Sequence, residues 1–207
     1  MSGSWLHRPL ESPRIYDLVQ RLLGAGDRTL DGVYSRGFGD SSGIVLDIGS
    51  GPIQETPLPR GTLIGVDVNQ AYVEQYANGP KSADCRLQGV VASAASLPFA
   101  TDSVDECRCV AVLHHLPDAL SRAAIGEMVR VTRRGGRIVI WEMLQPTSWS
   151  AGPLARLLCA LDRGQHLRTG DELAEMLLET SKLEWQEERF RYAWPRLHGG
   201  QWVTVKP

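Results

Sequence analysis

Short apolar runs alternate with segments of helical periodicity along most of the chain. The apolar runs lie at 44–48, 63–67, 86–91, 104–113 and 137–141. Nearly continuous runs of Val, Ile and Leu are typical of parallel strands that are buried on both faces. We therefore predict an α/β protein with a doubly wound, mostly parallel sheet.

Two helices are predicted between these strands. Asn69 is placed to cap a helix that reaches about Ala77, where Gly79–Pro80 stops it. Residues 117–118 open the second helix, and Gly135–Gly136 is expected to close it. The apolar stripe expected on the second helix consists of Leu120, Ala124, Met128 and Val131.

The C-terminal part of the chain predicts one more helix and a closing pair of strands. Thr169 and Glu172 have the spacing of a capping box, and they precede an apolar helix face. The tail 191–207 is interpreted as an antiparallel pair with a strand at 201–205 and a turn at Gly199–Gly200. The expected apolar helix face consists of Leu173, Met176 and Leu177.

We expect residues 1–207 to form a single domain, because the chain shows no repeat, low-complexity tract or long linker. Its expected parts are a helical N-terminal cover (1–40, with helices near 11–25 and 28–37), a core (44–142), an insertion over the substrate (144–168, with a helix at 153–163) and a closing helix and strands (169–207).

Composition narrows the class of protein. The chain has 207 residues, 43% of them hydrophobic and 22% charged, with a net charge of −2, which argues against a protein that coats nucleic acid. No apolar run approaches the roughly 18 to 20 residues of a membrane span, and the N-terminus lacks the pattern of a secretory signal. The four cysteines form no C-x-x-C pair, which favours buried thiols in the cytoplasm, and we expect no metal site.

Candidate chemistry begins where the first apolar run ends, in Asp47-Ile48-Gly49-Ser50-Gly51. Glycines at the end of a strand allow a ligand to approach the backbone closely, although this signal alone is common to many nucleotide binders. A nicotinamide-binding motif would place a third glycine at position 54, where this chain has Gln54. Asp47 indicates a site that faces a cationic group, and the alternative is a residue that forms a turn at the end of the strand.

A second acid, Asp67, ends the second apolar run. A carboxylate at this point can accept hydrogen bonds from both hydroxyls of a ribose. The alternative is that Asp67 caps the helix that follows.

Residues 44–142 resemble the class I S-adenosylmethionine-dependent methyltransferases, specifically the small-molecule group typified by ubiquinone/menaquinone biosynthesis (the type 11 group). The resemblance rests on motifs that occur in order with matching separations. These motifs are 45–51, Ile64-Gly65-Val66-Asp67, Ser96-Leu97-Pro98-Phe99, Asp102-Ser103-Val104-Asp105, Val112-Leu113-His114-His115-Leu116, and 127–131 leading to Gly135-Gly136-Arg137.

The resemblance implies a Rossmann-like, seven-stranded sheet with an antiparallel C-terminal strand, helices on both faces, and S-adenosylmethionine as the cofactor, with S-adenosylhomocysteine as the product. Asp47 and Gly49-Ser50-Gly51 would hold the methionine end. Asp67 would hold the ribose, and Val68 would lie against the adenine. The implied site is completed by Ser93 and Ala94 at the adenine amino group and by the backbone carbonyls around Cys109 and Val110 at the methionine ammonium.

The sequence departs from the family pattern at two places. Ser93 stands where the family usually has an acid, so recognition of the adenine should be weaker by on the order of 1 kcal/mol. Ile53 replaces the third glycine, and the prolines of segment 52–61 prevent the full helix expected there.

Methyl transfer from a sulfonium needs alignment and, for some acceptors, removal of a proton. His114 and His115 follow the fourth strand and are candidate general bases, and Glu142 is a weaker one. The alternative for each histidine is a loop residue held by backbone hydrogen bonds. Arg156 and Arg163, with His166 and Arg168, could meet an acidic or phosphorylated substrate, or they could belong to a solvated face.

The sequence thus predicts methyl transfer to a small-molecule acceptor, with no nucleic-acid partner and with the oligomeric state left open. A non-catalytic binding module of the same fold is the alternative. Two further rivals are a nicotinamide dehydrogenase, disfavoured by Gln54 and Asp47, and a nucleic-acid methyltransferase, whose usual motif after the fourth strand is replaced by Leu113-His114-His115-Leu116.

Overall fold

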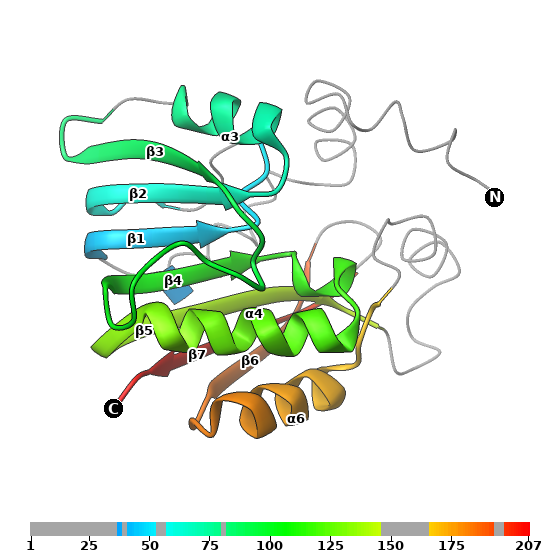
Figure 1. Cartoon of the computed structure of the whole chain (residues 1–207). Helices are drawn as coiled ribbons and strands as arrows, with labels where there is room; N and C mark the ends of the chain where they lie inside the picture. The colour runs from blue at the N-terminus through cyan, green and yellow to red at the C-terminus, as the bar shows by residue number, and fades with distance from the viewer. Residues whose placement is uncertain (1–36, 39–40, 53–56, 80–81, 146–165, 193–196) are drawn as a thin grey trace, which may run out of the picture.

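The computed structural model describes residues 37–38, 41–52, 57–79, 82–145, 166–192 and 197–207. The helices predicted at 11–25 and 153–163, and all but the last residue of the one predicted at 28–37, lie outside these residues. The sheet and the helices that flank it are described almost throughout (Figure 1).

The seven strands form one sheet in the order β3-β2-β1-β4-β5-β7-β6. Neighbours from β3 through β5 are parallel, whereas β7 runs antiparallel to both β5 and β6. This confirms the predicted doubly wound, mostly parallel sheet with an antiparallel C-terminal strand. The strands are β1 (Ser42–Ile48), β2 (Arg60–Asp67), β3 (Cys85–Val91), β4 (Val104–Val110), β5 (Thr132–Leu144), β6 (Gln186–Tyr192) and β7 (Leu197–Val205).

Helices lie on both faces of the sheet, as predicted. On one face α4 (Asp118–Val131) and α6 (Gly170–Ser181) pack side by side, and they share the main hydrophobic core with Leu46 and Ile48 of β1 (Figure 1). On the other face α3 (Gln70–Ala77) places Tyr76 against Val45 and Leu63. Alternate residues of β1 therefore serve opposite layers, as the pleat of a strand requires.

The predicted helix starts are confirmed at α3 and α6. Asn69 caps α3 by accepting a hydrogen bond from the backbone N–H of Ala71 at 3.0 Å. Thr169 and Glu172 form the expected capping box at the start of α6. No helix in the described part of the chain is long and apolar enough to cross a membrane.

Two predictions about α4 are wrong. The helix ends at Val131 and the chain passes directly into β5, so Gly135–Gly136 lies within the strand and does not close the helix. Leu120 is 45% exposed, because the buried face of α4 runs through Ser121, Ala124 and Ile125. The polar side chain of Ser121 tolerates burial because its hydroxyl donates a hydrogen bond to the backbone carbonyl of Leu116 at 3.1 Å.

The turn predicted at Gly199–Gly200 is also wrong, because both glycines lie inside β7. A Cβ at Gly199 would come within 2.6 Å of the Phe190 ring, and one at Gly200 within 2.4 Å of the Trp202 ring. These glycines therefore make room for aromatic rings. The strand that pairs with β7 is β6, which begins at Gln186 and not at 191.

Candidate functional site

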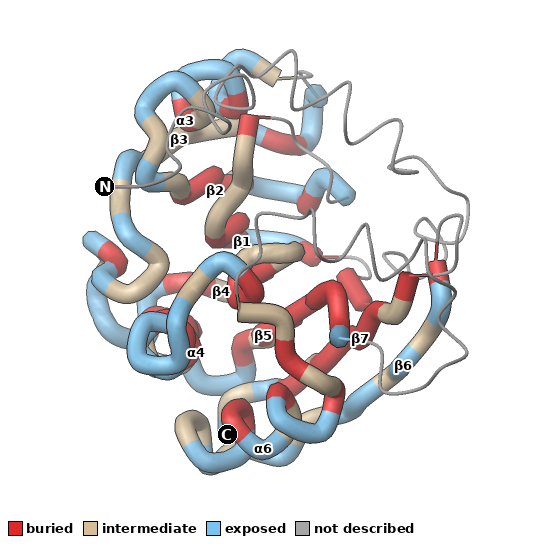
Figure 2. Tube along the Cα trace, turned by 90° about the vertical axis from the view of Figure 1, so that its right-hand side faces the viewer, coloured by how far each residue is buried: buried red, intermediate tan, exposed pale blue. Residues whose placement is uncertain are grey.

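The predicted cofactor residues meet at one edge of the sheet. The chain leaves β1 toward β2 on one side, and β4 lies on the other, so strand order reverses between β1 and β4. Open α/β sheets bind ligands at the carboxyl ends of the strands beside such a point. Figure 2 looks onto this edge. Asp47, the Gly49–Gly51 turn and Asp67 all come from the ends of β1 and β2.

The Gly49–Gly51 turn uses backbone conformations that favour glycine. Gly49 and Gly51 have φ angles of +67° and +61°. The backbone N–H groups of Gly49 and Ser50 both donate to the Val66 carbonyl, at 2.7 and 3.1 Å. A Cβ on Gly49 would lie 2.4 Å from Val112, whereas a Cβ on Gly51 would meet nothing within 4 Å. The turn is therefore packed behind Gly49 and open in front of Gly51.

Asp67 faces this turn across the end of β2. Its Oδ2 accepts from the Gly51 N–H at 3.1 Å, and its Oδ1 accepts from the Asn69 N–H at 2.8 Å. Each carboxylate oxygen has a further lone pair for a ligand. The alternative interpretation of Asp67 as a helix cap is wrong, because Asn69 is the cap of α3.

Asp47 lies inside the β1 ladder, opposite Gly65 of β2 and Arg108 of β4, so it does not form a turn at the strand end. It is 4% exposed, and its Oδ2 accepts a hydrogen bond from the Tyr76 hydroxyl at 2.8 Å. Gly65 makes room for the tyrosine, since a Cβ there would lie 2.5 Å from the ring. Burial first, and then the neighbouring Asp47 carboxylate, raise the pKa of Tyr76 well above its usual value.

The residues expected at the adenine lie beside Asp67. Val68 is 73% exposed, which is unusual for an apolar side chain, and Val91 at the end of β3 pairs with Asp67 and is also exposed. The Ser93 hydroxyl accepts a hydrogen bond from the Ala95 N–H at 3.2 Å and so stabilises its own turn. Ala94 is half-buried against the main core.

Strand β4 ends at Val110 and not at Leu113, because Ala111 adopts a φ of +54°. The Ala111 N–H still donates to the Trp141 carbonyl at 2.8 Å. Leu113–His115 then forms a turn of 3₁₀ helix. Cys109 is fully buried, and burial together with nearby Glu142 and Asp47 raises the pKa of its thiol.

Glu142 and His114 form a buried pair under this loop. His114 Nδ1 lies 2.7 Å from Glu142 Oε2, and the side chains are only 5% and 2% exposed. Glu142 Oε1 accepts from the backbone N–H groups of Val112 and Leu113, both at 2.6 Å. His115 is exposed, with its ring centroid 4.0 Å from that of His114.

Arg168 belongs neither to a solvated face nor to a surface that awaits an acidic substrate. It is 8% exposed and donates to the carbonyls of Leu113 at 2.8 Å and Leu116 at 2.9 Å. It also pairs with Asp118 at 2.7 Å. Arg168 therefore clamps the loop that carries the two histidines, a role that no local sequence pattern indicates.

Three aromatic side chains gather beside Val110 at the same edge. The Trp141 ring packs edge-on against Tyr192, with centroids 5.0 Å apart, and lies 5.9 Å from Phe190. Phe190 and Tyr192 were not predicted as site residues. Their spacing of two on β6 was the available signal, since it puts both rings on one face of the strand.

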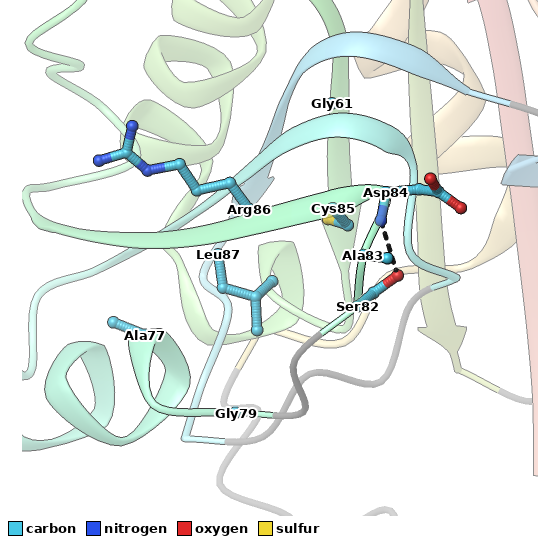
Figure 3. A pocket seen from close by; sticks show the side chains of 9 residues that line it. All are labelled: Gly61, Ala77, Gly79, Ser82, Ala83, Asp84, Cys85, Arg86 and Leu87. Atoms are coloured by element: carbon cyan, nitrogen blue, oxygen red, sulfur yellow. Dashed lines mark hydrogen bonds between the residues drawn. The ribbon is translucent and has the colours of Figure 1, made fainter.

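A cavity of about 470 Å³ lies at the opposite edge, where β2 and β3 begin and α3 ends (Figure 3). Its lining includes Gly61, Gly79 and Arg86, and a hydrogen bond from the Asp84 N–H to the Ser82 hydroxyl spans 3.3 Å within it. None of the predicted cofactor residues lines this cavity, so it is separate from the candidate site.

Comparisons with known proteins decide the family. Residues 46–140 match the family model described as a methyltransferase domain. A ubiquinone/menaquinone biosynthesis C-methyltransferase from Hahella chejuensis is 30% identical over 172 residues, which cover 71% of this chain and 67% of that protein. The chain belongs to the S-adenosylmethionine-dependent methyltransferases. The resemblance seen in the sequence is confirmed.

Other similar proteins support the same family and fold. An uncharacterized methyltransferase from Mycobacterium marinum is 36% identical over 107 residues, which cover 51% of this chain and 41% of the relative. This chain thus spans less than half the length of several curated relatives that it matches. A solved S-adenosylmethionine-dependent methyltransferase from Methanosarcina mazei has a TM-score of 0.65 at 20% identity, covering 86% of this chain and 96% of that one, and supports the fold.

Proposed function

We propose that this chain binds S-adenosylmethionine at the carboxyl edge of β1, β2 and β4, transfers its methyl group to a small-molecule acceptor, and releases S-adenosylhomocysteine. The observation that carries the proposal is the open turn at Gly51 held against the Asp67 carboxylate. An open backbone at Gly51 allows the ligand to approach closely. The carboxylate of Asp67 has lone pairs that can accept hydrogen bonds from the hydroxyls of a nucleoside.

Asp67 would accept hydrogen bonds from the ribose hydroxyls, since both its oxygens are already oriented by the backbone N–H groups of Gly51 and Asn69. Val68 would cover one face of the adenine with its exposed side chain. Because the Ser93 hydroxyl is engaged in its own turn, the adenine amino group would be recognised through the backbone of Ser93 and Ala94.

The methionine end would lie over the Gly49-Ser50-Gly51 backbone. Asp47 would support the methionine end from within β1, because its carboxylate is buried beside Tyr76. The ladder between β1 and β4 ends at Ile48 and Cys109. The backbone at this end, at Cys109 and Val110, is where the methionine ammonium would find carbonyl acceptors.

The histidines would align the acceptor and accept its proton where it carries one. Glu142 is best suited to a positioning role, because its carboxylate accepts hydrogen bonds from two backbone N–H groups and from His114. A histidine that donates from Nδ1 carries its proton there and keeps the lone pair on Nε2. His115 is the exposed member of the pair and is better placed to touch an acceptor.

A small-molecule acceptor in the cytoplasm remains our proposal. The net charge of −2 gives no general attraction to a polyanion. In the described part of the chain, Cys85, Cys107 and Cys109 are buried free thiols, which suits a reducing compartment. The aromatic cluster of Trp141, Phe190 and Tyr192 beside Val110 favours an acceptor with an apolar portion.

Isothermal titration with S-adenosylmethionine and with S-adenosylhomocysteine tests the proposal, with NADH as the control ligand. We expect both sulfur compounds to bind in the micromolar range and NADH not to bind. No heat from either sulfur compound at high micromolar concentration would contradict the proposal and favour a non-catalytic module. Binding of NADH would revive the dehydrogenase alternative.

A further inference from the structure

Strand β4 carries a charged pair in the middle of the sheet. Glu106 and Arg108 are 4% and 0% exposed, and Arg108 Nε lies 2.5 Å from Glu106 Oε1. Burying two charges is costly, and an apolar pair of similar size usually stabilises a fold as well or better. Overall stability therefore does not explain the pair, and its other contacts indicate what it holds.

Arg108 reaches the segment that follows the glycine turn. Its Nη1 donates to the backbone carbonyl of Pro57, and its guanidinium lies 4.8 Å from the centroid of the Phe38 ring. Its Nη2 is buried without a hydrogen-bond partner. The side chain thus connects β4 to residues on both sides of β1.

Glu106 completes this connection. Its Oε2 accepts from the Ser41 hydroxyl at 2.7 Å and lies 3.4 Å from Arg137 Nε on β5. The Ser41 carbonyl in turn accepts from the Arg60 N–H at 2.9 Å, where β2 begins. The start of β2 is therefore held by hydrogen bonds that run from Arg60 through Ser41 to Glu106.

The described residues that lead into β2 have no regular secondary structure. Residues 52, 57 and 59 are prolines, which have no N–H to donate, and residues 57–59 lie in neither a helix nor a strand. A guanidinium donor on the Pro57 carbonyl supplies a fixed point that the local backbone does not. Arg108 is also the strand partner of Asp47, two residues before Gly49.

We propose that Arg108 is a positioning residue for the cofactor: through the Pro57 carbonyl it ties the entry to β2 to β4 beside Asp47, and so keeps the Gly49–Gly51 turn in its binding geometry. The inference rests on the proposed function, because it assumes that S-adenosylmethionine and S-adenosylhomocysteine bind at this turn.

The test compares Arg108→Met with Arg137→Met by titration with S-adenosylhomocysteine, at a temperature where thermal unfolding shows every variant to be folded. Both arginines contact Glu106, but Arg137 donates to the Gly37 carbonyl and not to Pro57. We expect R108M to raise the Kd at least tenfold and R137M to change it less than threefold. Arg108→Lys keeps a donor and should recover part of the affinity.

A folded R108M with a Kd within threefold of the wild type would overturn the inference, as would an equal loss in R137M or no recovery in R108K. A lower melting temperature with an unchanged Kd would show a merely structural role. If R108M does not fold, the double variant E106Q/R108M leaves no buried charge unpaired and takes its place. If the wild type itself binds neither sulfur compound, the proposed function fails instead.

Discussion

The backbone N–H of Gly51 donates a hydrogen bond to Oδ2 of Asp67 over 3.1 Å, which ties the turn after β1 to the end of β2. The other carboxylate oxygen accepts from Asn69, the residue that caps α3. The glycine turn, the carboxylate and the start of the helix are therefore one hydrogen-bonded unit. A change at one of them is expected to be measurable at the others.

The two glycines of the turn should respond differently to alanine. Both have positive φ, so each substitution costs about 1–2 kcal/mol of backbone strain. Gly49→Ala adds a clash with Val112 and should lower the free energy of unfolding by about 1–3 kcal/mol more than Gly51→Ala does. Gly51→Ala should instead weaken S-adenosylhomocysteine binding, because its methyl group would project into the open space that we propose for the cofactor. Denaturant unfolding and titration measure both effects; equal unfolding losses would contradict the packing described.

Tyr76→Phe should change how stability depends on pH. Burial, and after it Asp47, raises the pKa of Tyr76 above its unfolded value of about 10, so the folded protein keeps a proton that the unfolded chain loses above that pH. Stability from this group is complete below about pH 10 and falls above it, by up to about 1.4 kcal/mol per pH unit.

Y76F should therefore show a shallower loss above pH 10 than the wild type, together with a uniform loss of about 1–3 kcal/mol, because Asp47 loses the hydrogen bond from the tyrosine hydroxyl. The buried thiols of Cys85, Cys107 and Cys109, whose pKa values are also raised, are present in both proteins and act with the same sign, so the comparison isolates Tyr76. Urea unfolding from pH 8 to 11 is the measurement. Identical slopes would show that Tyr76 ionises normally in the folded state.

Glu142→Gln should switch the tautomer of His114. If the amide oxygen keeps the N–H groups of Val112 and Leu113, its NH₂ faces His114 Nδ1 and forces that atom to accept. ¹⁵N shifts of the imidazole should move from the Nδ1–H to the Nε2–H form, with a loss of about 1–3 kcal/mol of stability. The exposed Glu179→Gln on α6 is the control; it should leave the tautomer unchanged and cost less than about 1 kcal/mol of stability. An unchanged tautomer in E142Q would refute the assignment.

Arg168→Met should destabilise the protein by about 2–4 kcal/mol, because Arg168 makes charged hydrogen bonds to two buried carbonyls and to Asp118. Arg122→Met is the matched control. Its ion pair with Glu179 has side chains that are 43% and 49% exposed, so the cost should stay below about 1 kcal/mol. Denaturant midpoints separate the two, and similar losses would argue against the clamp.

Local patterns in the sequence were sufficient for strands β1 to β5 and for the starts of two helices. Continuous apolar runs gave β1 to β5, and the side chains of Asn69 and Thr169 gave the starts of α3 and α6. The pair Gly199–Gly200 does not by itself distinguish a turn from a close contact, because glycine is common at both. Only the partner rings of Phe190 and Trp202 decide between the two.

That Gly49–Gly51 and Asp67 lie side by side could be predicted, because both follow from the ends of neighbouring strands. Partners far apart in the chain could not be predicted: Tyr76 bonds Asp47, and Arg168 bonds the carbonyl of Leu113, with no local pattern at either place. Arg108 had a visible signal, since a charge inside an apolar run must find a partner. The sequence does not say that one of its partners is the carbonyl of Pro57.

The affinity of Asp67→Ala for S-adenosylhomocysteine, measured by titration beside the wild type, tests the central claim most directly. The variant removes the acceptor that we propose for the ribose hydroxyls, and it removes the hydrogen bonds that hold Gly51 and Asn69. We predict a Kd raised more than about tenfold, equal to about 1.4 kcal/mol, in a protein that remains folded. A folded D67A that binds as tightly as the wild type would contradict the placement of the cofactor at this turn.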